Sequence, residues 1–162
     1  MLTTLATVLH VLEGMLPPLP VPGAKLGLAN IITVATIALL GARFGLAVAV
    51  SRVILGSLLI GFSVVGFAMS MSGALLSWLV MVLLYGRFRE RLSLVGISLA
   101  GAVAHNVAQL TVASWVLEQV ATFTLLPYLL FFAVPTGIMV GLTAGLLIKA
   151  MAKAKIQGGL QR

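Results

Sequence analysis

The sequence predicts an all-α membrane protein, a compact bundle of six transmembrane helices that forms a single domain over residues 1–162. Hydrophobic residues make up 61% of the chain and charged residues only 8%. Soluble domains carry roughly 45–50% apolar and about 25% charged residues. The apolar residues also form six runs, most of which approach the about 20 residues that a helix needs to cross a bilayer. We therefore expect a multi-pass protein of the inner (cytoplasmic) membrane.

The six predicted spans are separated by breaks with physical causes. The spans are roughly 2–16, 26–41, 44–61, 64–85, 93–117 and 125–148. The four prolines between residues 17 and 22 end the first span, because proline cannot continue a helix. Residues 41–43 form a tight charged turn, and residues 86–91 are too polar for lipid. Pro127 lies near the first turn of the last span, where proline is tolerated.

The distribution of basic residues predicts that both termini lie in the cytoplasm. Eight of the ten basic residues lie in the turn after the second span, the turn after the fourth span and the tail: Arg43, Arg87, Arg89, Arg91, Lys149, Lys153, Lys155 and Arg162. With six spans, all eight fall on one face, which the positive-inside rule makes cytoplasmic. Because these residues mark topology, we expect membrane lipid as a partner and no nucleic acid.

Arg52 lies in the middle of the third span, where a charge costs several kcal/mol unless it is paired or hydrated. It either contacts an anion inside a cavity or has a structural partner, such as a helix C-terminus, Glu13 or another buried polar group. Glu13 lies near the outer end of the first span, so we expect solvent around it. His10, three residues earlier, is close enough to pair with it.

The fifth span carries His105, Asn106 and Gln109 within an arc of about 100°. Their surroundings are apolar, so these residues form the polar face of a helix that otherwise suits lipid. Such a face suits the polar groups of a ligand and suits an interhelical hydrogen-bond network equally well. The sequence alone favours neither interpretation over the other.

The segment from Pro17 to Asn30 is the most distinctive stretch of the chain. Prolines stiffen it, glycines permit close backbone approach, and Lys25 and Asn30 add a cation and an amide near the outer face. It forms either a lid over an outward-facing pocket or a rigid interfacial turn in which Lys25 touches lipid headgroups. The candidate substrate-binding residues are therefore Lys25, Asn30, Arg52, His105, Asn106 and Gln109.

Small residues repeat at four-residue intervals in the last two spans. They are Gly137, Gly141 and Gly145 in the last span, and Ala100, Ala104 and Ala108 in the fifth. Small residues at this spacing let helix backbones approach closely. The glycines pack within the chain or provide a docking face for a partner helix.

Several chemistries have no signal in the sequence. The chain has no P-loop run and no H-E-x-x-H pattern, so nucleotide binding through a P-loop and a zinc site of that kind are not expected. It has no Cys or Asp, and its acids are Glu13, Glu90 and Glu118. We expect no cofactor, no metal and no catalytic residue, and therefore not an enzyme.

The run PLPVPGAKLGLANIITVATIALLG, followed by SRVILGSLLIGF, resembles a bacterial membrane family known as heptaprenyl diphosphate synthase component I and as the Gx transporter family. The likeness runs over nearly the whole chain. Its most specific parts are K-L-G-L-A-N-I at Lys25–Ile31 and R-x-x-x-G-S at Arg52–Ser57. The six-span plan is also similar to the substrate-binding S component of energy-coupling-factor (ECF) transporters. This resemblance implies that Lys25–Asn30 forms the lid and that His105, Asn106 and Gln109 line the pocket.

Two functional hypotheses follow. The first is a substrate-binding membrane subunit for uptake of a small polar or anionic solute, energised by a partner such as a coupling transmembrane subunit with ATPases. A carrier that acts alone is its nearest variant, and an acid embedded in the membrane favours that variant. The second is a non-catalytic membrane component of isoprenoid or quinone metabolism that binds a prenyl diphosphate.

Overall fold

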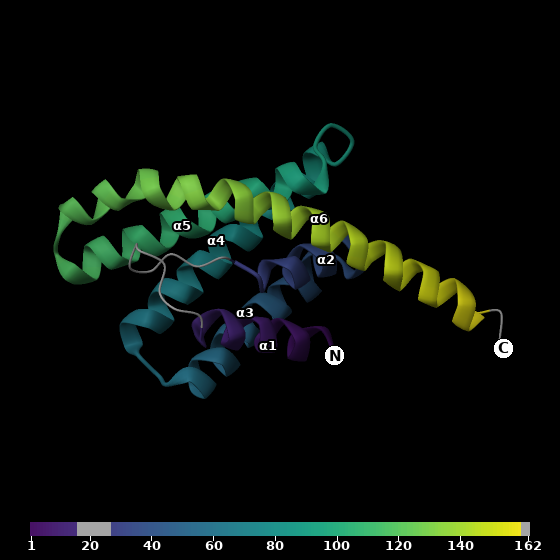
Figure 1. Ribbon diagram of the computed structural model, residues 1–162, viewed down its shortest axis with the longest axis horizontal. Coiled ribbons are helices and arrows are strands. Elements are labelled where there is room, and N and C mark those ends of the chain that lie inside the picture. The colour runs from purple at the N-terminus through teal and green to yellow at the C-terminus, as the bar shows by residue number, and fades with distance from the viewer. Residues whose placement is uncertain (16–26, 160–162) are drawn as a thin grey trace.

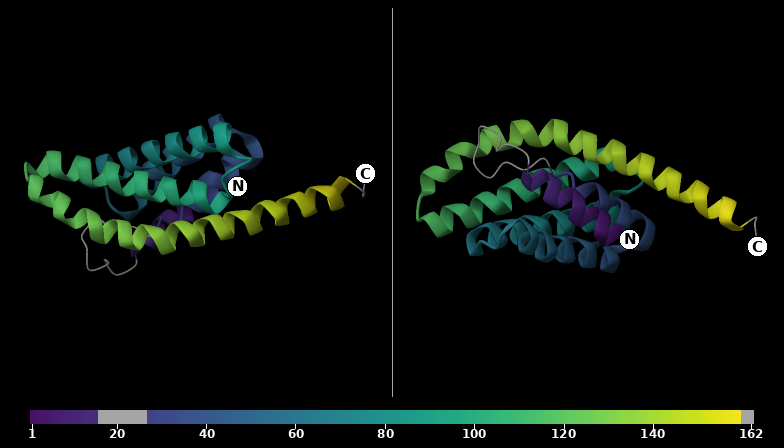
Figure 2. Two further views of the ribbon diagram at one scale, coloured as in Figure 1. Left: turned by 90° about the horizontal axis from the view of Figure 1, so that it is seen from above. Right: turned by 60° about the horizontal axis from the view of Figure 1, so that its bottom comes forward.

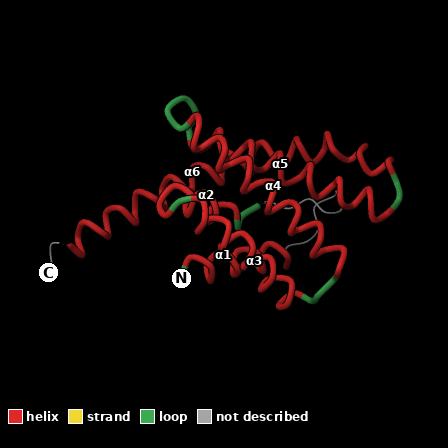
Figure 3. Tube along the Cα trace, turned by 180° about the vertical axis from the view of Figure 1, so that it is seen from behind, coloured by secondary structure: helices red, strands yellow, loops and turns green. Residues whose placement is uncertain are grey.

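The computed structural model describes residues 1–15 and 27–159 and confirms the all-α class. Figure 1 shows the helices packed side by side in a bundle, and Figure 3 shows that the described links between them are short. The elements are α1 (Leu2–Met15), α2 (Asn30–Leu40), α3 (Ala42–Ile60), α4 (Val64–Phe88), α5 (Leu94–Leu117), the 3₁₀-helix η1 (Val120–Leu125) and α6 (Leu126–Gly159).

Local chemistry sets most helix boundaries. Ser63 and Ser93 cap α4 and α5, because each side-chain oxygen accepts a hydrogen bond from the backbone N–H three residues on, at 3.3 and 3.2 Å. Gly41 lies between α2 and α3 with a φ of +94°, and Gly61 ends α3 with a φ of +117°. Only glycine adopts these angles without strain, so both breaks are encoded in the sequence.

Helix α2 is the centre of the bundle. Every residue from Asn30 to Ile37 is buried, and its apolar side chains belong to the main hydrophobic core together with Val48, Met81 and Ile97. The predicted second span, 26–41, is in the structure a helix that starts at Asn30. Gly27 has a φ of +71° and forms a turn before it, which delays the start of the helix.

The described helices differ in their capacity to cross a membrane. Helices α3, α4, α5 and α6 are long and apolar enough to span one. Helices α1 and α2 have 14 and 11 residues, which correspond to about 21 and 17 Å, less than the about 30 Å of hydrocarbon. The bundle is therefore a multi-pass membrane fold with four long helices and two short ones.

Helices α5 and α6 pack most closely at the glycines of α6. A Cβ added at Gly137 would lie 2.7 Å from the Cα of Leu99, and one added at Gly141 would meet the backbone of Val95. These glycines are therefore covered by α5 of the same chain. Of the two alternatives for this stripe, the structure supports packing within the chain at both positions.

Helix α6 is longer than the sequence predicts. Its 34 residues measure about 51 Å, and the helix continues past the predicted end at residue 148 because nothing after it breaks a helix before Gly158. Figure 2 shows this end projecting beyond the other helices, and shows the helix to be curved. Pro135 lies inside it and removes one backbone hydrogen bond, which is a common cause of bending.

Apart from Arg52, the basic residues of the described chain gather at one end of the bundle. One pocket is lined jointly by Ala38 at the end of α2, Arg89 in the turn after α4, and Ile148 on α6. We call this the basic end, defined by Arg43, Arg87, Arg89, Arg91, Lys149 and Lys153. The structure thus places the predicted basic turns together, while the side of the membrane that they face remains a prediction.

Candidate functional site

Arg52 is enclosed in the bundle and hydrogen-bonded to α2. Its side chain is 2% exposed, and its Nη2 donates to Oδ1 of Asn30 at 2.7 Å. Its Nε has no hydrogen-bond partner among the described residues. The structure therefore joins two predicted site residues from different helices. Of the two alternatives for Arg52, this contact supports a structural partner, here Asn30, over a bound anion.

Glu13 compensates part of this buried charge. It is 9% exposed, interacts electrostatically with Arg52, and accepts a hydrogen bond from the backbone N–H of Gly27. The expectation that Glu13 is solvated was therefore wrong. A guanidinium inside an apolar bundle favours a buried carboxylate beside it, and the Gly27 N–H needs an acceptor. Glu13 and Arg52 thus hold the two ends of the segment Gly27–Asn30.

Helix α1 also packs directly on α3, through His10. The ring of His10 occupies the place where a Cβ of Gly56 would lie, and His10 is itself buried. Gly56 follows Arg52 by four residues, so both lie on the same face of α3. The R-x-x-x-G spacing therefore has a structural cause: the arginine contacts α2 and the glycine admits a side chain of α1.

Asn30 also faces a small polar cavity on its other side. This cavity has a volume of about 10 Å³ and is lined by Gly27, Asn30, Ser98, Ala102, His105, Asn106, Thr136 and Val140. Its volume is about the least that holds one water molecule. Nδ2 of Asn106 donates to the carbonyl oxygen of Leu129 at 3.2 Å. Three predicted site residues, Asn30, His105 and Asn106, thus meet here.

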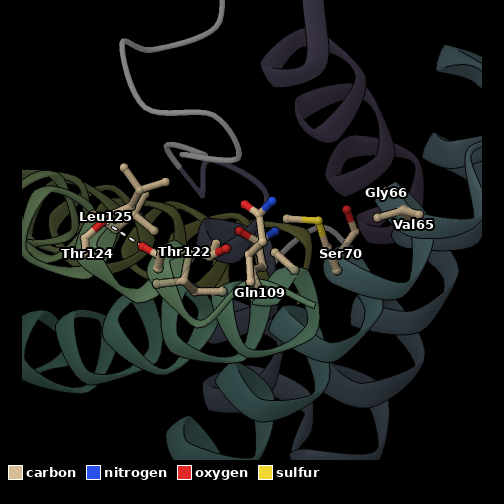
Figure 4. A pocket seen from close by; sticks show the side chains of 13 residues that line it. Val65, Gly66, Ser70, Gln109, Thr122, Thr124 and Leu125 are labelled. Atoms are coloured by element: carbon tan, nitrogen blue, oxygen red, sulfur yellow. Dashed lines mark hydrogen bonds between the residues drawn. The ribbon is translucent and has the colours of Figure 1, made fainter. Parts of the chain in front are cut away.

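Gln109 faces a different and much larger cavity. This open cavity of about 630 Å³ lies between α4, the end of α5, η1 and the start of α6; its lining residues are Val65, Gly66, Met69, Ser70, Gln109, Leu110, Ala113, Gln119, Ala121, Thr122, Thr124, Leu125 and Leu129. None of these residues is charged. Figure 4 shows Gln109 at the centre, with Ser70 on one side and Thr122 and Thr124 on the other. We call the end of the bundle that holds this cavity the cavity end.

Gln109 is the polar centre of the large cavity. Its side chain is 3% exposed, and its Oε1 has no hydrogen-bond partner among the described residues. An amide oxygen buried in this way costs free energy unless something donates to it. Thr124 already donates to the carbonyl of Ala121 at 2.7 Å. Gln109 therefore brings to the cavity wall a buried hydrogen-bond acceptor that no described residue satisfies.

One glycine of α4, Gly73, packs against a lining residue of each cavity. A Cβ added at Gly73 would lie 2.8 Å from Cε1 of His105 and 2.9 Å from Cγ of Gln109. The glycine therefore lets α4 pack directly against both side chains. His105 and Gln109 are one helical turn apart on α5, so the polar face predicted for this helix serves both cavities. Residues 16–26, which include Lys25 and most of the segment from Pro17 to Asn30, lie outside the described residues.

Sequence reasoning missed several polar residues of the site. Ser70, Thr122 and Thr124 line the large cavity, and Ser98 and Thr136 line the small one. Single hydroxyl residues are common in apolar helices, so each is a weak signal alone. A stronger sequence signal lies on α4, in Ser70, Gly73 and Ser77. The structure buries all three residues. Their spacing of three and four residues marks a small, polar helix face.

The described residues contain no group of three His, Cys, Asp or Glu side chains that could hold a metal ion. The site offers instead amide and hydroxyl groups in an apolar setting. Such groups orient a bound molecule through hydrogen bonds, and the apolar wall excludes water.

A family model described as heptaprenyl diphosphate synthase component I matches residues 2–147. The match covers α1 to α5, η1 and most of α6. Comparison with curated proteins gives no match, and comparison with solved structures gives none either.

Proposed function

On the premise that this chain belongs to the heptaprenyl diphosphate synthase component I family, we propose that it is a substrate-binding membrane subunit for uptake of a small polar solute. The family name suggests a component of heptaprenyl diphosphate synthesis, and four long apolar helices indicate a multi-pass membrane protein. The uptake role goes beyond both statements. The observation that carries it is the cavity of about 630 Å³ around Gln109.

The size and lining of this cavity support the proposal. Pockets for small molecules have volumes of about 300–1,000 Å³, are mostly apolar and contain a few polar groups that fix orientation. Here the apolar wall comes from Val65, Leu110 and Leu129, and the polar groups from Gln109 and the threonines of η1. Because the lining has no charged side chain, we propose an uncharged amphipathic solute in preference to an anion.

Two sets of residues have different roles in this proposal. Gln109 contacts the solute and sets its orientation. Glu13 and Arg52 position the segment Gly27–Asn30, whose two end residues line the small cavity. His105 and Asn106 line the small cavity behind Gln109, so they act on the solute through their packing on α4 and α6.

The energy for uptake comes, in this proposal, from a partner in the inner membrane. The sequence has no P-loop, so an ATP-hydrolysing subunit of the ECF kind is the natural source. A carrier that acts alone is the variant, and the buried Glu13 now favours it more than the sequence did. Buried carboxylates in membrane proteins often mark proton or ion pathways.

The second candidate function is a non-catalytic membrane component that binds a prenyl diphosphate, and the family match favours it. Catalysis on a diphosphate through Mg²⁺ uses carboxylate ligands. The chain has no Asp and three Glu residues. Of these, Glu13 is engaged with Gly27, and Glu90 and Glu118 lie in separate turns. We therefore propose binding without catalysis for this candidate too.

The two candidates are separated by what the native protein carries. The chain is purified gently from its own membrane, and the bound small molecules and proteins are identified by mass spectrometry. A bound uncharged solute, or a coupling subunit with ATPases, supports the uptake proposal. A bound polyprenyl diphosphate or a prenyl synthase subunit contradicts it and supports the second candidate.

A cavity variant shows whether a bound solute occupies the proposed site. Ala113 is buried and lines the large cavity, so Ala113→Trp fills it. Val112, its neighbour on α5, lines a shallow outer groove between α4 and α5 instead, so Val112→Trp is the matched control. The solute is expected to be absent from Ala113→Trp and retained by Val112→Trp. Retention by both variants would place the solute elsewhere.

A further inference from the structure

The basic end contains a pocket that is separate from both cavities of the candidate site. Its volume is about 320 Å³, and its lining comes from the ends of α2 and α4, the start of α5, and α6: Ala38, Tyr85, Arg89, Leu92, Ser93, Leu94, Ile97 and Ile148. It shares no residue with the large cavity or the small polar one. The proposed solute role makes no use of it.

This pocket is apolar on one side and cationic on the other. Ala38, Ile97 and Ile148 provide an apolar wall, and Arg89 contributes the charge. The guanidinium carbon of Arg89 lies 5.7 Å from the centre of the Tyr85 ring. This cation–π contact keeps the guanidinium beside the pocket, with its hydrogen-bond donors available to a ligand.

The surroundings of the pocket strengthen its positive field. Arg87 and Arg91 flank Arg89 and are exposed, while Glu90 is the one acid of this turn. On the opposite side, α6 continues from Ile148 into the exposed residues Lys149 and Lys153. Because several cations lie at an end of the bundle where the described residues offer one carboxylate, an anion that enters this region is attracted.

We propose that this pocket binds the phosphate headgroup of an anionic membrane lipid, whose first hydrocarbon segment lies against Ala38, Ile97 and Ile148. Arginine binds phosphate through paired N–H donors, and basic clusters beside membrane helices attract anionic lipids. A soluble phosphate would gain nothing from the apolar wall. A zwitterionic lipid would gain less from Arg89, because its ammonium group offsets the charge of its phosphate. The combination of the two surfaces therefore selects an anionic amphiphile.

The proposal is tested by native mass spectrometry of the detergent-purified chain, titrated with phosphatidic acid and with phosphatidylcholine of the same acyl chains. We expect phosphatidic acid to bind at least about ten-fold more tightly. Arg89→Gln is expected to weaken this binding about ten-fold, the effect of losing one charge-assisted hydrogen bond. Arg43→Gln is the matched control, because Arg43 is an exposed arginine of the same end that does not line the pocket.

A second variant tests the apolar wall without a change of charge. Ala38→Phe fills the pocket from α2 and is expected to weaken binding of phosphatidic acid to a similar degree. Circular dichroism and thermal unfolding show whether each variant is folded. Ala38 is half-buried and Arg89 exposed, so both variants are expected to fold.

Three outcomes would overturn the proposal. Equal binding of both lipids would show that the net negative charge of the headgroup is not recognised. Equal weakening by Arg43→Gln and Arg89→Gln would show a diffuse attraction with no role for the pocket. Inorganic diphosphate that binds as tightly as the lipid, and displaces it, would assign the site to a soluble ligand.

Discussion

At the cavity end, α4, α5 and the start of α6 enclose about 630 Å³ with an uncharged lining; at the basic end, a pocket of about 320 Å³ has Arg89 at its mouth. The large cavity and the basic pocket lie near opposite ends of the same helix, α5. This helix contributes Gln109 to the cavity, and its N-cap residue Ser93 lines the basic pocket. A charge near the membrane surface costs little, whereas one in the hydrocarbon costs several kcal/mol. The chain therefore offers neutral hydrogen-bonding groups in its interior and cations at its end.

Arg52 is an exception to this division, because it is a cation in the interior of the bundle. Asn30 and Glu13 lie beside it, and it lines neither pocket. Its charge is therefore used to hold α1, α2 and α3 together. Substitutions at the buried cluster, the cavity end and the basic end separate these three roles.

The largest effect is expected at the buried cluster. Arg52→Leu leaves Glu13 without its compensating charge, and loss of one partner of a buried pair costs about 3–5 kcal/mol of folding stability. Arg89→Leu removes the same side chain from an exposed position, where we expect a change within about 0.5 kcal/mol. Thermal unfolding in detergent measures both. An Arg52→Leu protein as stable as Arg89→Leu would mean that the buried charge has no structural role.

An intermediate effect is expected at the seam between α5 and α6, which joins the two ends. Gly137→Ala forces its Cβ against the backbone of Leu99, and overpacking of this kind costs about 1–3 kcal/mol. Gly86→Ala is the control within α4, since a Cβ there meets nothing within 4 Å. The same unfolding measurement is expected to show a loss for Gly137→Ala and none for Gly86→Ala. Similar stability of both would refute close packing at this seam.

The smallest effect is expected at Gln109. Gln109→Leu keeps the volume of the side chain but removes the amide, so affinity for the molecule that co-purifies with the chain is expected to fall about five-fold. Folding stability is expected to be unchanged or higher, because Oε1 of Gln109 has no partner among the described residues. Thr111→Val, on the exposed side of α5, is the control. Unchanged affinity in Gln109→Leu would remove Gln109 from the solute site.

The sequence predicted the fold class because hydrophobicity along the chain is a local property. It also marked Arg52 as a buried cation that needs an anion or a structural partner, with Glu13 among the candidates, but it did not predict the contact of Arg52 with Asn30. Neither helix shows by itself that a side chain 22 residues away will supply its hydrogen bond. Glu13 was misplaced for the same reason, since its burial depends on Arg52 and on the turn at Gly27. Gln109 and His105 appeared as one polar face on α5, and only the packing of α4 divides that face between two cavities.

Helix lengths were the other limit of sequence reasoning. Hydrophobicity marks where lipid contact ends, not where a helix ends. Helix α6 therefore extends to Gly159, well past its predicted apolar span. Helix α2 is shorter than predicted because the backbone of Gly27 turns, and a protein interior rather than lipid surrounds most of it.

The most direct test of two separate sites is native mass spectrometry on two variants side by side. Ala113→Trp fills the cavity end, and Arg89→Gln removes the cation of the basic end. We expect Ala113→Trp to lose the co-purified solute and to keep phosphatidic acid. Arg89→Gln is expected to keep the solute and to bind phosphatidic acid about ten-fold more weakly. If either variant lost both ligands while remaining folded, the two ends would form one site, which contradicts their separation into a neutral cavity and a cationic pocket.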